Sequence, residues 1–390
     1  MLPARLLPAA LLVSLMPVTA ADRDTLLTVS QSSDSSVFLE LGSSGRKNIA
    51  ASNERVGVVW EQIDAGKATV FAAFKTNDQA AFDKPVRLSE NDAASPVIAY
   101  CGERFYLAWI DDGQPRVSIS QDQVPPESVT GAGDSVNELS IGCADNSALV
   151  AFSKRVGPDY AIYVTRADKT DTGLAVAEPV SIAPLDKYRF QTNPGVAYSK
   201  ERIVVTWHDR TSGTNLLYAT SGPSLDTLPD QVQINELIQK SYEWGSGSSA
   251  IRNAITVGKK QRLVVTWLDK RASRSGYKVY SAFSDSGGLR WSDNYKISDE
   301  WGDIVPAWTP AIASDGKRKL RVVWMDTRED ENALWYSNLS GMSWSQDYNL
   351  ASTSEGASNP VIAYSPDGHF HAAWIQKTEG KETRIVYFSK

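Results

Sequence analysis

The chain is poor in the residues that build metal centres and disulfide frameworks. Its 390 residues include two cysteines and three histidines, His208, His369 and His371. Three histidines are too few for a multinuclear histidine-ligated centre, although a mixed site with carboxylates stays open. Two cysteines cannot hold a chain of this length together, so a hydrophobic core must do so. We therefore expect no cofactor and no dedicated metal site.

Long hydrophobic runs are also missing, apart from one at the start of the chain. Arg5 precedes the apolar residues 6–16, and small residues follow at 18–20, so residues 1–21 are predicted to be a secretory signal. This run is too short to span a bilayer, and we expect no transmembrane segment in residues 22–390. No cysteine follows the signal, so a lipoprotein anchor is not expected. The prediction is an exported protein, periplasmic or secreted.

Positive charge is in deficit. The chain has 40 basic and 46 acidic residues, and loss of Arg5 with the signal leaves 39 against 46, a net charge of −7. Nucleic acids and anionic membranes require a basic face on their partners, so neither is expected as a partner. The sequence also lacks a phosphate loop, a dinucleotide-binding glycine pattern, a Cys-x-x-Cys motif and a Ser-His-Asp arrangement.

No long run with helical periodicity occurs, and a repeat organises the chain instead. Each unit has an alternating apolar segment, often opened by proline, then an apolar run ending in an aromatic residue, then a further apolar run. The aromatic anchors are Trp60, Trp109, Phe152, Trp207, Trp267, Trp324 and Trp374. Four short strands per unit of this length are typical of a propeller blade. We predict an all-β fold: a seven-bladed β-propeller of four-stranded antiparallel blades, formed by residues 22–390 as one domain, with buried anchors.

Two further features concern how the blades are joined. The last unit has three predicted strands, and Leu26–Ser30 is expected to supply the fourth and close the ring, which leaves no long exposed edge. Cys101 and Cys143 each end the inner strand of neighbouring blades. An exported protein permits a disulfide, so a bridge between blades 2 and 3 is expected, with a free buried pair as the alternative.

Several segments of the repeat resemble the sialidase-like propellers with Asp-box (BNR) repeats. Segments similar to the Trp-x-Asp-x-Arg pattern frequent in that family are 207–210, 267–271 and 324–328. The segment Ser284–Trp291 is similar to a degenerate Asp box in which Ser286 takes the aspartate position, and 337–344 is a more decayed copy. The resemblance implies the propeller fold and, in that family, Asp boxes that are structural turns far from the active site.

The same resemblance implies an activity. Sialidases of this family bind the substrate carboxylate with three arginines, open the first blade with Arg-Ile-Pro, and use a tyrosine–glutamate pair with an aspartate as acid/base. Here the arginines between Leu27 and Trp60 are Arg46 and Arg55, and neither precedes Ile-Pro. Those sialidases have six blades, whereas the anchors predict seven.

A ligand site in a propeller usually lies where the loops between strands two and three and the loops between blades emerge together. In this chain the loops after the anchors carry Asp209, Arg210, Asp269, Arg271, Asp326 and Arg328, and the loops between blades carry Tyr188, Arg189, Trp244, Trp301, Asp303 and Trp308. The three tryptophans lie outside the repeat register and suit stacking on a saccharide, unless their loops bury them. The repeated Asp and Arg suggest salt bridges, with an anion site at the axis as the alternative.

Three functions fit this pattern. The first is an exported recognition propeller without enzymatic activity, which binds a glycan or a partner protein through the top-face loops of blades 4 to 6. Its ligand-binding residues would be Tyr188, Trp244, Trp301, Trp308, Asp209, Arg210 and Asp326. The second is a sialidase-related glycoside hydrolase or lyase, with Asp269 or Asp303 as acid/base and Arg189, Arg271 and Arg328 as the anion-binding residues. The third is a structural platform subunit of an envelope complex.

Overall fold

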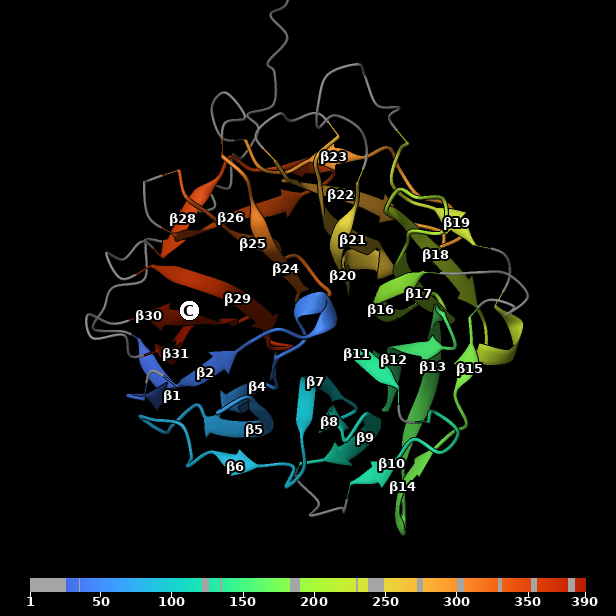
Figure 1. The fold of residues 1–390 in the computed structure, drawn as a ribbon. Helices are drawn as coiled ribbons and strands as arrows, with labels where there is room; N and C mark the ends of the chain where they lie inside the picture. Colours follow the sequence, from blue (N-terminus) through green and yellow to red (C-terminus); the bar gives the residue numbers. More distant parts are fainter. Residues whose placement is uncertain are drawn as a thin grey trace, which may run out of the picture.

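Seven antiparallel sheets are arranged around a central axis (Figure 1). The computed structural model describes residues 26–34, 36–120, 126–133, 135–182, 190–228, 231–237, 249–271, 276–299, 305–328, 332–351, 356–377 and 383–390. The predicted seven-bladed β-propeller is confirmed. Within these ranges no helix is long and apolar enough to cross a membrane. The predicted signal, residues 1–21, lies outside the described residues.

In blades 2 to 4 the strands follow one another outward from the axis. Blade 2 contains β7 (Ala93–Cys101), β8 (Arg104–Asp111), β9 (Gln114–Ile119) and β10 (Glu127–Ser128). Blade 3 contains β11 (Val136–Ala144), β12 (Ser147–Val156), β13 (Asp159–Thr170) and β14 (Gly173–Val176), with β15 (Val180–Ser181) also on β13. Blade 4 contains β16 (Gln191–Ser199), β17 (Arg202–Asp209), β18 (Leu216–Gly222) and β19 (Val232–Gln233).

Blades 5 to 7 repeat this plan. Blade 5 contains β20 (Ile251–Val257), β21 (Leu263–Asp269), β22 (Lys278–Ser284) and β23 (Tyr295–Lys296). Blade 6 contains β24 (Trp308–Ser314), β25 (Leu320–Asp326), β26 (Ala333–Ser340) and β27 (Ser343–Trp344), with β28 (Tyr348–Ala351) also on β26. Blade 7 contains β29 (Ala357–Tyr364), β30 (Phe370–Lys377), β31 (Thr383–Ser389) and β1 (Leu27–Ser32).

The N-terminal strand closes the ring, as predicted. β1 is the outer strand of blade 7 and pairs antiparallel with β31, with Leu27 opposite Tyr387 and Ser32 opposite Thr383. The first and last described strands therefore share one sheet, and the outer edge of β31 is paired.

The aromatic anchors occupy the same position in the second strand of every blade. Each is at most 2% exposed. Four of them stack on an aromatic residue of the third strand, with ring centroids between 5.7 and 6.2 Å apart. Aromatic side chains of this size bury a large apolar area, so the repeated anchor fills the space between successive blades. Their predicted burial is confirmed.

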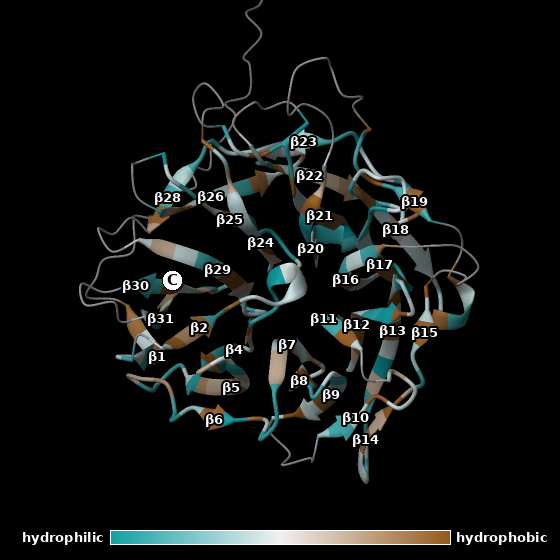
Figure 2. Cartoon of the chain, in the orientation of Figure 1, coloured by the Kyte–Doolittle hydropathy of each residue, from teal (hydrophilic) through white to brown (hydrophobic). Residues whose placement is uncertain are grey.

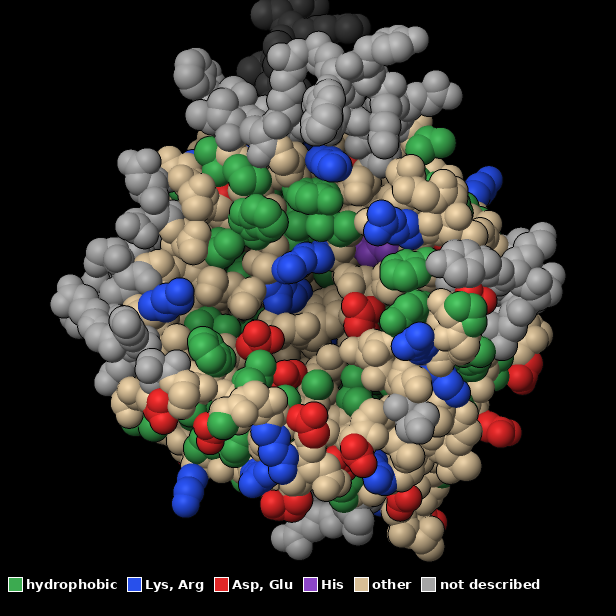
Figure 3. Space-filling view, viewed as in Figure 1, with side chains coloured by type: hydrophobic (Ala, Val, Ile, Leu, Met, Phe, Trp, Pro, Cys, Tyr) green, Lys and Arg blue, Asp and Glu red, His purple; other side chains and the backbone are tan. Residues whose placement is uncertain are grey.

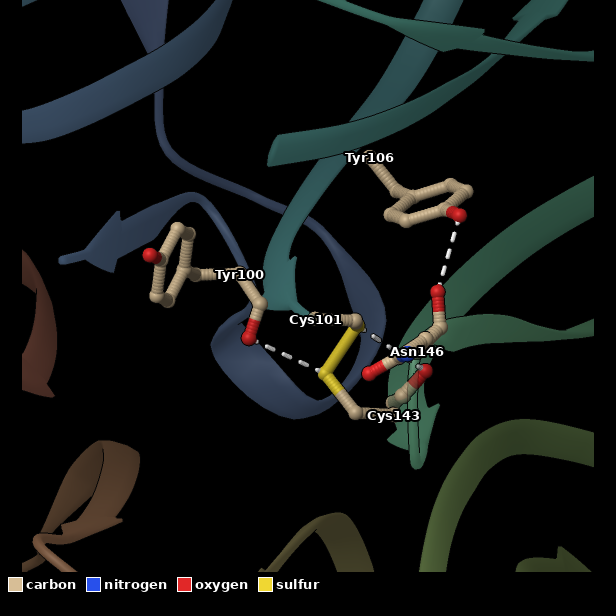
Figure 4. The surroundings of a disulfide bond; sticks show 6 residues. Tyr100, Cys101, Tyr106, Cys143 and Asn146 are labelled. Carbon is tan, nitrogen blue, oxygen red and sulfur yellow. Dashed lines mark hydrogen bonds between the residues drawn. A yellow bond between two sulfur atoms is a disulfide. The ribbon is translucent and has the colours of Figure 1, made fainter. Parts of the chain in front are cut away.

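A disulfide joins blades 2 and 3 (Figure 4). Cys101 and Cys143 have Cα atoms 5.4 Å apart. The two positions are not equivalent in register, because Cys101 lies opposite Arg104 at the end of its hairpin, whereas Cys143 lies opposite Ala148, one residue earlier in its own. Beside the bridge, the Tyr106 hydroxyl donates to the Asn146 carbonyl over 2.9 Å.

Removing the disulfide is expected to destabilise the propeller. The bridge spans 42 residues of sequence. A cross-link over such a loop restricts the unfolded chain, so replacing both cysteines by alanine should lower the free energy of unfolding by about 2–4 kcal/mol. Chemical denaturation measures this loss. A reductant should destabilise the wild-type protein and leave the double variant unchanged, and equal sensitivity of both proteins would contradict the prediction.

Blade 1 departs from the plan at its inner strand. β2 (Val37–Glu40) and β3 (Ile49–Ala51) both pair with β4 (Arg55–Asp64), which is followed by β5 (Lys67–Thr76) and β6 (Val86–Arg87). Residues 41–48 leave the sheet between β2 and β3, and they carry the 3-10 helix η2 (Ser44–Arg46). This axial segment, residues 41–48, lies at the centre of the ring in Figure 1, and Figure 2 shows η2 as hydrophilic to neutral.

Buried hydrogen bonds hold the axial segment. The Asn48 side chain donates to the carbonyls of Val59 and Pro96, over 3.2 and 3.0 Å, and accepts from the Ser43 hydroxyl over 2.6 Å. Gly45 has φ 66°, the left-handed conformation that glycine adopts without a steric penalty. The axial segment contributes to the walls of two cavities, one at each end of the inner strands.

Candidate functional site

The smaller axial cavity is polar and lies where the inner strands begin. It has a volume of about 220 Å³. Its lining residues are Gly42, Ser43, Ser44, Gly45, Arg46, Glu138, Asn193, Arg252, Asn253 and Pro310. On this face Lys and Arg side chains gather at the centre, with acidic side chains around part of the opening (Figure 3). The second-to-third strand loops emerge on the same face, which is the one predicted to carry function.

A shared bulge shapes the start of the inner strands. In five of them one residue has φ between 49° and 56°: Ser95, Asn193, Arg252, Thr309 and Asn359. The strand register shifts at the same positions. A bulge inserts an extra residue and re-aims side chains, and left-handed backbone in non-glycine residues clusters at functional sites. Asn193 and Arg252 owe their place in the cavity wall to this feature.

Two arginines, Arg46 and Arg252, line the cavity, and neither forms an ion pair with a carboxylate in the described part of the chain. The Arg46 guanidinium donates to the Leu41 carbonyl and, over 3.0 Å, to Asn359 Oδ1. Arg252 is exposed, and the structure gives it no ion pair or side-chain hydrogen bond within the described ranges. Burial and, after it, the charge of Arg252 lower the pKa of Arg46 to about 9, while Glu40 acts in the opposite direction. Two guanidinium groups held close together favour an anion between them.

Glu138 supplies the carboxyl group of the cavity. Its two oxygens accept from the Asn193 backbone N–H over 2.5 Å and from Asn193 Nδ2 over 3.0 Å, which links blade 3 to blade 4. Burial raises the pKa of Glu138, and the two hydrogen bonds from Asn193 act against that rise. A carboxyl group with a raised pKa in a polar cavity is suited to proton transfer.

His208 lies behind Asn253, which lines the cavity. His208 Nε2 accepts from the Asn253 backbone N–H over 3.0 Å, so the neutral ring carries its proton on Nδ1. The Asn253 side chain donates to the Asn193 carbonyl over 2.6 Å and accepts from the Thr206 hydroxyl over 2.7 Å. Burial lowers the pKa of His208 to about 3. Among the described residues, no three His, Cys, Asp or Glu side chains are grouped to hold a metal ion.

Acid is expected to destabilise the fold through His208. Its pKa is about 3 in the folded protein, against an ordinary value of 6.5 for the unfolded chain, so between these values the unfolded chain binds one more proton. The free energy of unfolding should therefore fall by about 1.4 kcal/mol for each pH unit as the pH drops through this window. His208→Gln, which keeps an acceptor for Asn253, should show a shallower pH dependence in chemical denaturation. An unchanged slope would contradict the prediction.

The aspartate and arginine predicted in blade 5 form a buried ion pair. Asp269 is fully buried and accepts from Trp267 Nε1 over 3.3 Å and from Arg271 Nε and NH2 over 3.0 and 2.8 Å. Arg271 also pairs with Glu236 over 3.1 Å. Neither Asp269 nor Arg271 lines the axial cavity, so the structure supports the salt-bridge interpretation of this pair.

Blade 6 repeats the arrangement. Asp326 accepts from Trp324 Nε1 over 3.1 Å and from Arg328 NH2 over 2.6 Å, and Arg328 also pairs with Asp347 over 2.8 Å. Blade 4 differs, because its arginine follows the aspartate directly. Asp209 accepts from the Thr211 N–H over 2.7 Å, while Arg210 is exposed and makes no ion pair with the described part of the chain.

The other predicted site residues fall largely outside the described ranges. Those not described are Tyr188, Arg189, Trp244, Trp301 and Asp303. Trp308 is described: it is 37% exposed and opens β24, directly before the bulge of that strand. Of the three tryptophans predicted on the rim of blades 4 to 6, Trp308 is therefore the one that the structure describes.

None of the residues that line this cavity is among the candidates chosen by sequence, and those missed include Arg46, Glu138, Asn193 and Arg252. The sequence could have pointed to Asn193, because it directly precedes the repeat proline Pro194; the structure starts β16 earlier, at Gln191, so the proline does not open the strand as predicted. Arg252 holds the corresponding position in blade 5, where Asn253 replaces the proline. Arg46 had no repeat signal, because it lies in the segment that interrupts blade 1.

No protein-family model matches this chain, and no curated protein matches its sequence. Its fold is similar to that of the polysaccharide lyase Uly1, with 8% identity and a TM-score of 0.61 over 90% of each chain. It is also similar to an ulvan lyase described as a new family of polysaccharide lyase, with 10% identity and a TM-score of 0.57 over 88% of this chain and 92% of the other. A Trypanosoma rangeli sialidase matches with 9% identity and a TM-score of 0.47, and the match spans 53% of that chain. Identities this low establish the propeller fold alone.

Proposed function

We propose that this protein is an exported carbohydrate-active propeller that binds a carboxylated saccharide in the smaller axial cavity. The observation that carries the proposal is the pairing of Arg46 and Arg252 in that cavity without an ion-paired carboxylate among the described residues. A ligand carboxylate would accept hydrogen bonds from both guanidinium groups and offset their mutual repulsion.

The rest of the cavity suits a sugar. Asn193, Asn253 and the serines of the axial segment offer amide and hydroxyl groups, which hydrogen-bond saccharide hydroxyls. Trp308, at the start of β24, presents a partly exposed indole on which a sugar ring could stack. In this proposal the saccharide is recognised at the axis and by Trp308 on the rim of blades 4 to 6. The similarity to two named polysaccharide lyases agrees with a carbohydrate ligand.

Calorimetric titration with matched saccharides tests the proposal. The ligands are short oligosaccharides of galacturonate, glucuronate and sialate, each compared with its methyl ester, which keeps the sugar and removes the charge. We expect at least one acid to bind about tenfold or more tightly than its ester, because the uncharged ester cannot form charge-assisted hydrogen bonds with the two arginines. Equal affinity for every acid and its ester, or no binding, would reject the axial site. The same titration of the Trp308→Ala variant measures how much of the saccharide affinity comes from this tryptophan on the rim.

A second candidate function is cleavage of the same saccharide by a hydrolase or lyase mechanism. Glu138 favours it, because a carboxyl group with a raised pKa in the same cavity could exchange a proton with the substrate. Release of reducing ends or unsaturated uronate products from the acidic polymers measures the activity. Glu138→Gln should abolish cleavage while the saccharide still binds, and cleavage that survives this change would remove Glu138 from the mechanism.

The proposal includes export and a distant relationship to sialidase-like propellers with Asp-box (BNR) repeats. The turn at Ser284–Trp291 supports the relationship, since the Ser286 hydroxyl accepts from the Arg290 N–H over 2.9 Å at the aspartate position of that motif. Cell fractionation and N-terminal sequencing test export. We expect an exported mature chain that begins at Asp22. A cytoplasmic protein that still carries residues 1–21 would contradict export.

A further inference from the structure

A second, larger cavity lies at the end of the inner strands opposite to the saccharide cavity. Its volume is about 750 Å³, within the range of small-molecule sites. It is lined by the last residues of the inner strands and by the turns that follow them. Its lining combines isoleucine, valine and alanine side chains with polar ones, and three half-buried tyrosines, Tyr100, Tyr198 and Tyr364, belong to it.

Lys47 brings a positive charge to the aliphatic part of this cavity. It comes from the axial segment, and its ammonium group donates to the Ile255 carbonyl over 3.1 Å. The structure gives it no ion pair within the described ranges, and burial lowers the pKa of Lys47 to about 8. The other charged lining residues, Asp145, Lys200 and Glu201, are exposed and belong to the turns at the cavity mouth. An ammonium group withdrawn from water without a counter-ion carries a desolvation cost that an anionic ligand would offset.

We propose that the larger axial cavity is a second binding site, which takes a small organic anion with an apolar body, such as an aromatic carboxylate. The carboxylate would accept a hydrogen bond from the Lys47 ammonium group, and the body would pack among the tyrosine rings and aliphatic walls. Its residues differ from those of the saccharide cavity, so this site does not depend on the proposed function.

Titration with 4-phenylbutyrate and with the matched alcohol 4-phenylbutan-1-ol tests the proposal. We expect the acid to bind with one-to-one stoichiometry and about tenfold more tightly than the alcohol, since only the acid meets the charge. Lys47→Met should reduce the affinity for the acid to that for the alcohol. Tyr198→Ser should lower the affinity for the acid and for the alcohol by a similar factor, because both ligands would pack against this tyrosine ring.

Two control variants locate the site. Lys259→Met changes an exposed lysine on the same face that does not line this cavity, and Arg252→Met changes the saccharide cavity, so both should bind 4-phenylbutyrate like the wild-type protein. Thermal unfolding confirms that each variant is folded. The proposal is overturned if the acid and the alcohol bind equally, if the acid does not bind up to about 10 mM, or if folded Lys47→Met keeps the full preference for the acid.

Discussion

Replacing Asp269 by alanine is expected to lower the free energy of unfolding by about 3–5 kcal/mol, because removal of one member of a buried ion pair leaves the other charge unpaired. Asp269 is fully buried, and the Arg271 side chain is 3% exposed. The same carboxylate accepts hydrogen bonds from the Trp267 indole and from the Ser249 N–H. All these donors lose their acceptor in the variant, and Glu236 alone remains as a described ion partner of Arg271.

Chemical denaturation of three alanine variants isolates this effect. Asp326→Ala removes the equivalent carboxylate in blade 6 and should cost a similar amount. Asp209→Ala is the matched control, because Asp209 holds the same position in blade 4 but has no arginine ion pair within the described ranges. We expect its loss to be about 1–2 kcal/mol, the value of backbone and amide hydrogen bonds. Equal losses for Asp209→Ala and Asp269→Ala would contradict the role of the buried arginine.

Replacing both Arg46 and Arg252 by methionine is expected to reduce the affinity for the carboxylated saccharide by about 100-fold or more. Each guanidinium–carboxylate hydrogen bond contributes about 1.5–3 kcal/mol, which corresponds to roughly tenfold or more per arginine. Arg252→Met alone should cost about tenfold and leave stability unchanged, since Arg252 is exposed. Arg46 also holds the axial segment through Leu41 and Asn359, so its loss should lower stability as well.

Arg210→Met is the control for the arginine pair. Arg210 is an exposed arginine at the end of the second strand of blade 4 and does not line the saccharide cavity. Binding of the acid should be unchanged in this variant, and binding of the methyl ester should be unchanged in Arg252→Met. The axial site would be contradicted if Arg210→Met lost binding of the acid while folded Arg252→Met kept it in full. The saccharide would then bind at the outer loops.

The blades and their order could be predicted from the sequence because blade packing is periodic. Each anchor, such as Trp267 or Trp324, must be buried at the same place in its strand, so the aromatic residue recurs at similar intervals. Alternation of apolar residues indicates strands, and Pro194 and Pro310 lie close to the starts of β16 and β24, which begin at Gln191 and Trp308. Closure by Leu27–Ser32 follows from the unpaired edge that the last unit would otherwise expose.

The axial cavities could not be predicted in the same way. The Asp and Arg after the anchors fit a site by residue type, yet Arg271 lies in a buried ion pair and not in the axial cavity. Arg46 lacks a following Ile-Pro and therefore matches no sialidase motif, although the segment that carries it reaches the axis. The tryptophan loops that prompted the rim hypothesis lie mostly in ranges that the structure does not describe, so that part stays a prediction.

The sequence by itself determined the all-β class, the number of blades and the buried anchors, because these depend on burial patterns that recur along each unit. Only the tertiary structure decided that Arg46 and Arg252 line the same cavity and that Lys47 lines the larger one. Arg46 and Arg252 belong to blades 1 and 5, and their side chains approach only when the closed ring brings the inner strands to one axis. Convergence on an axis is a property of the whole ring, which no single repeat encodes.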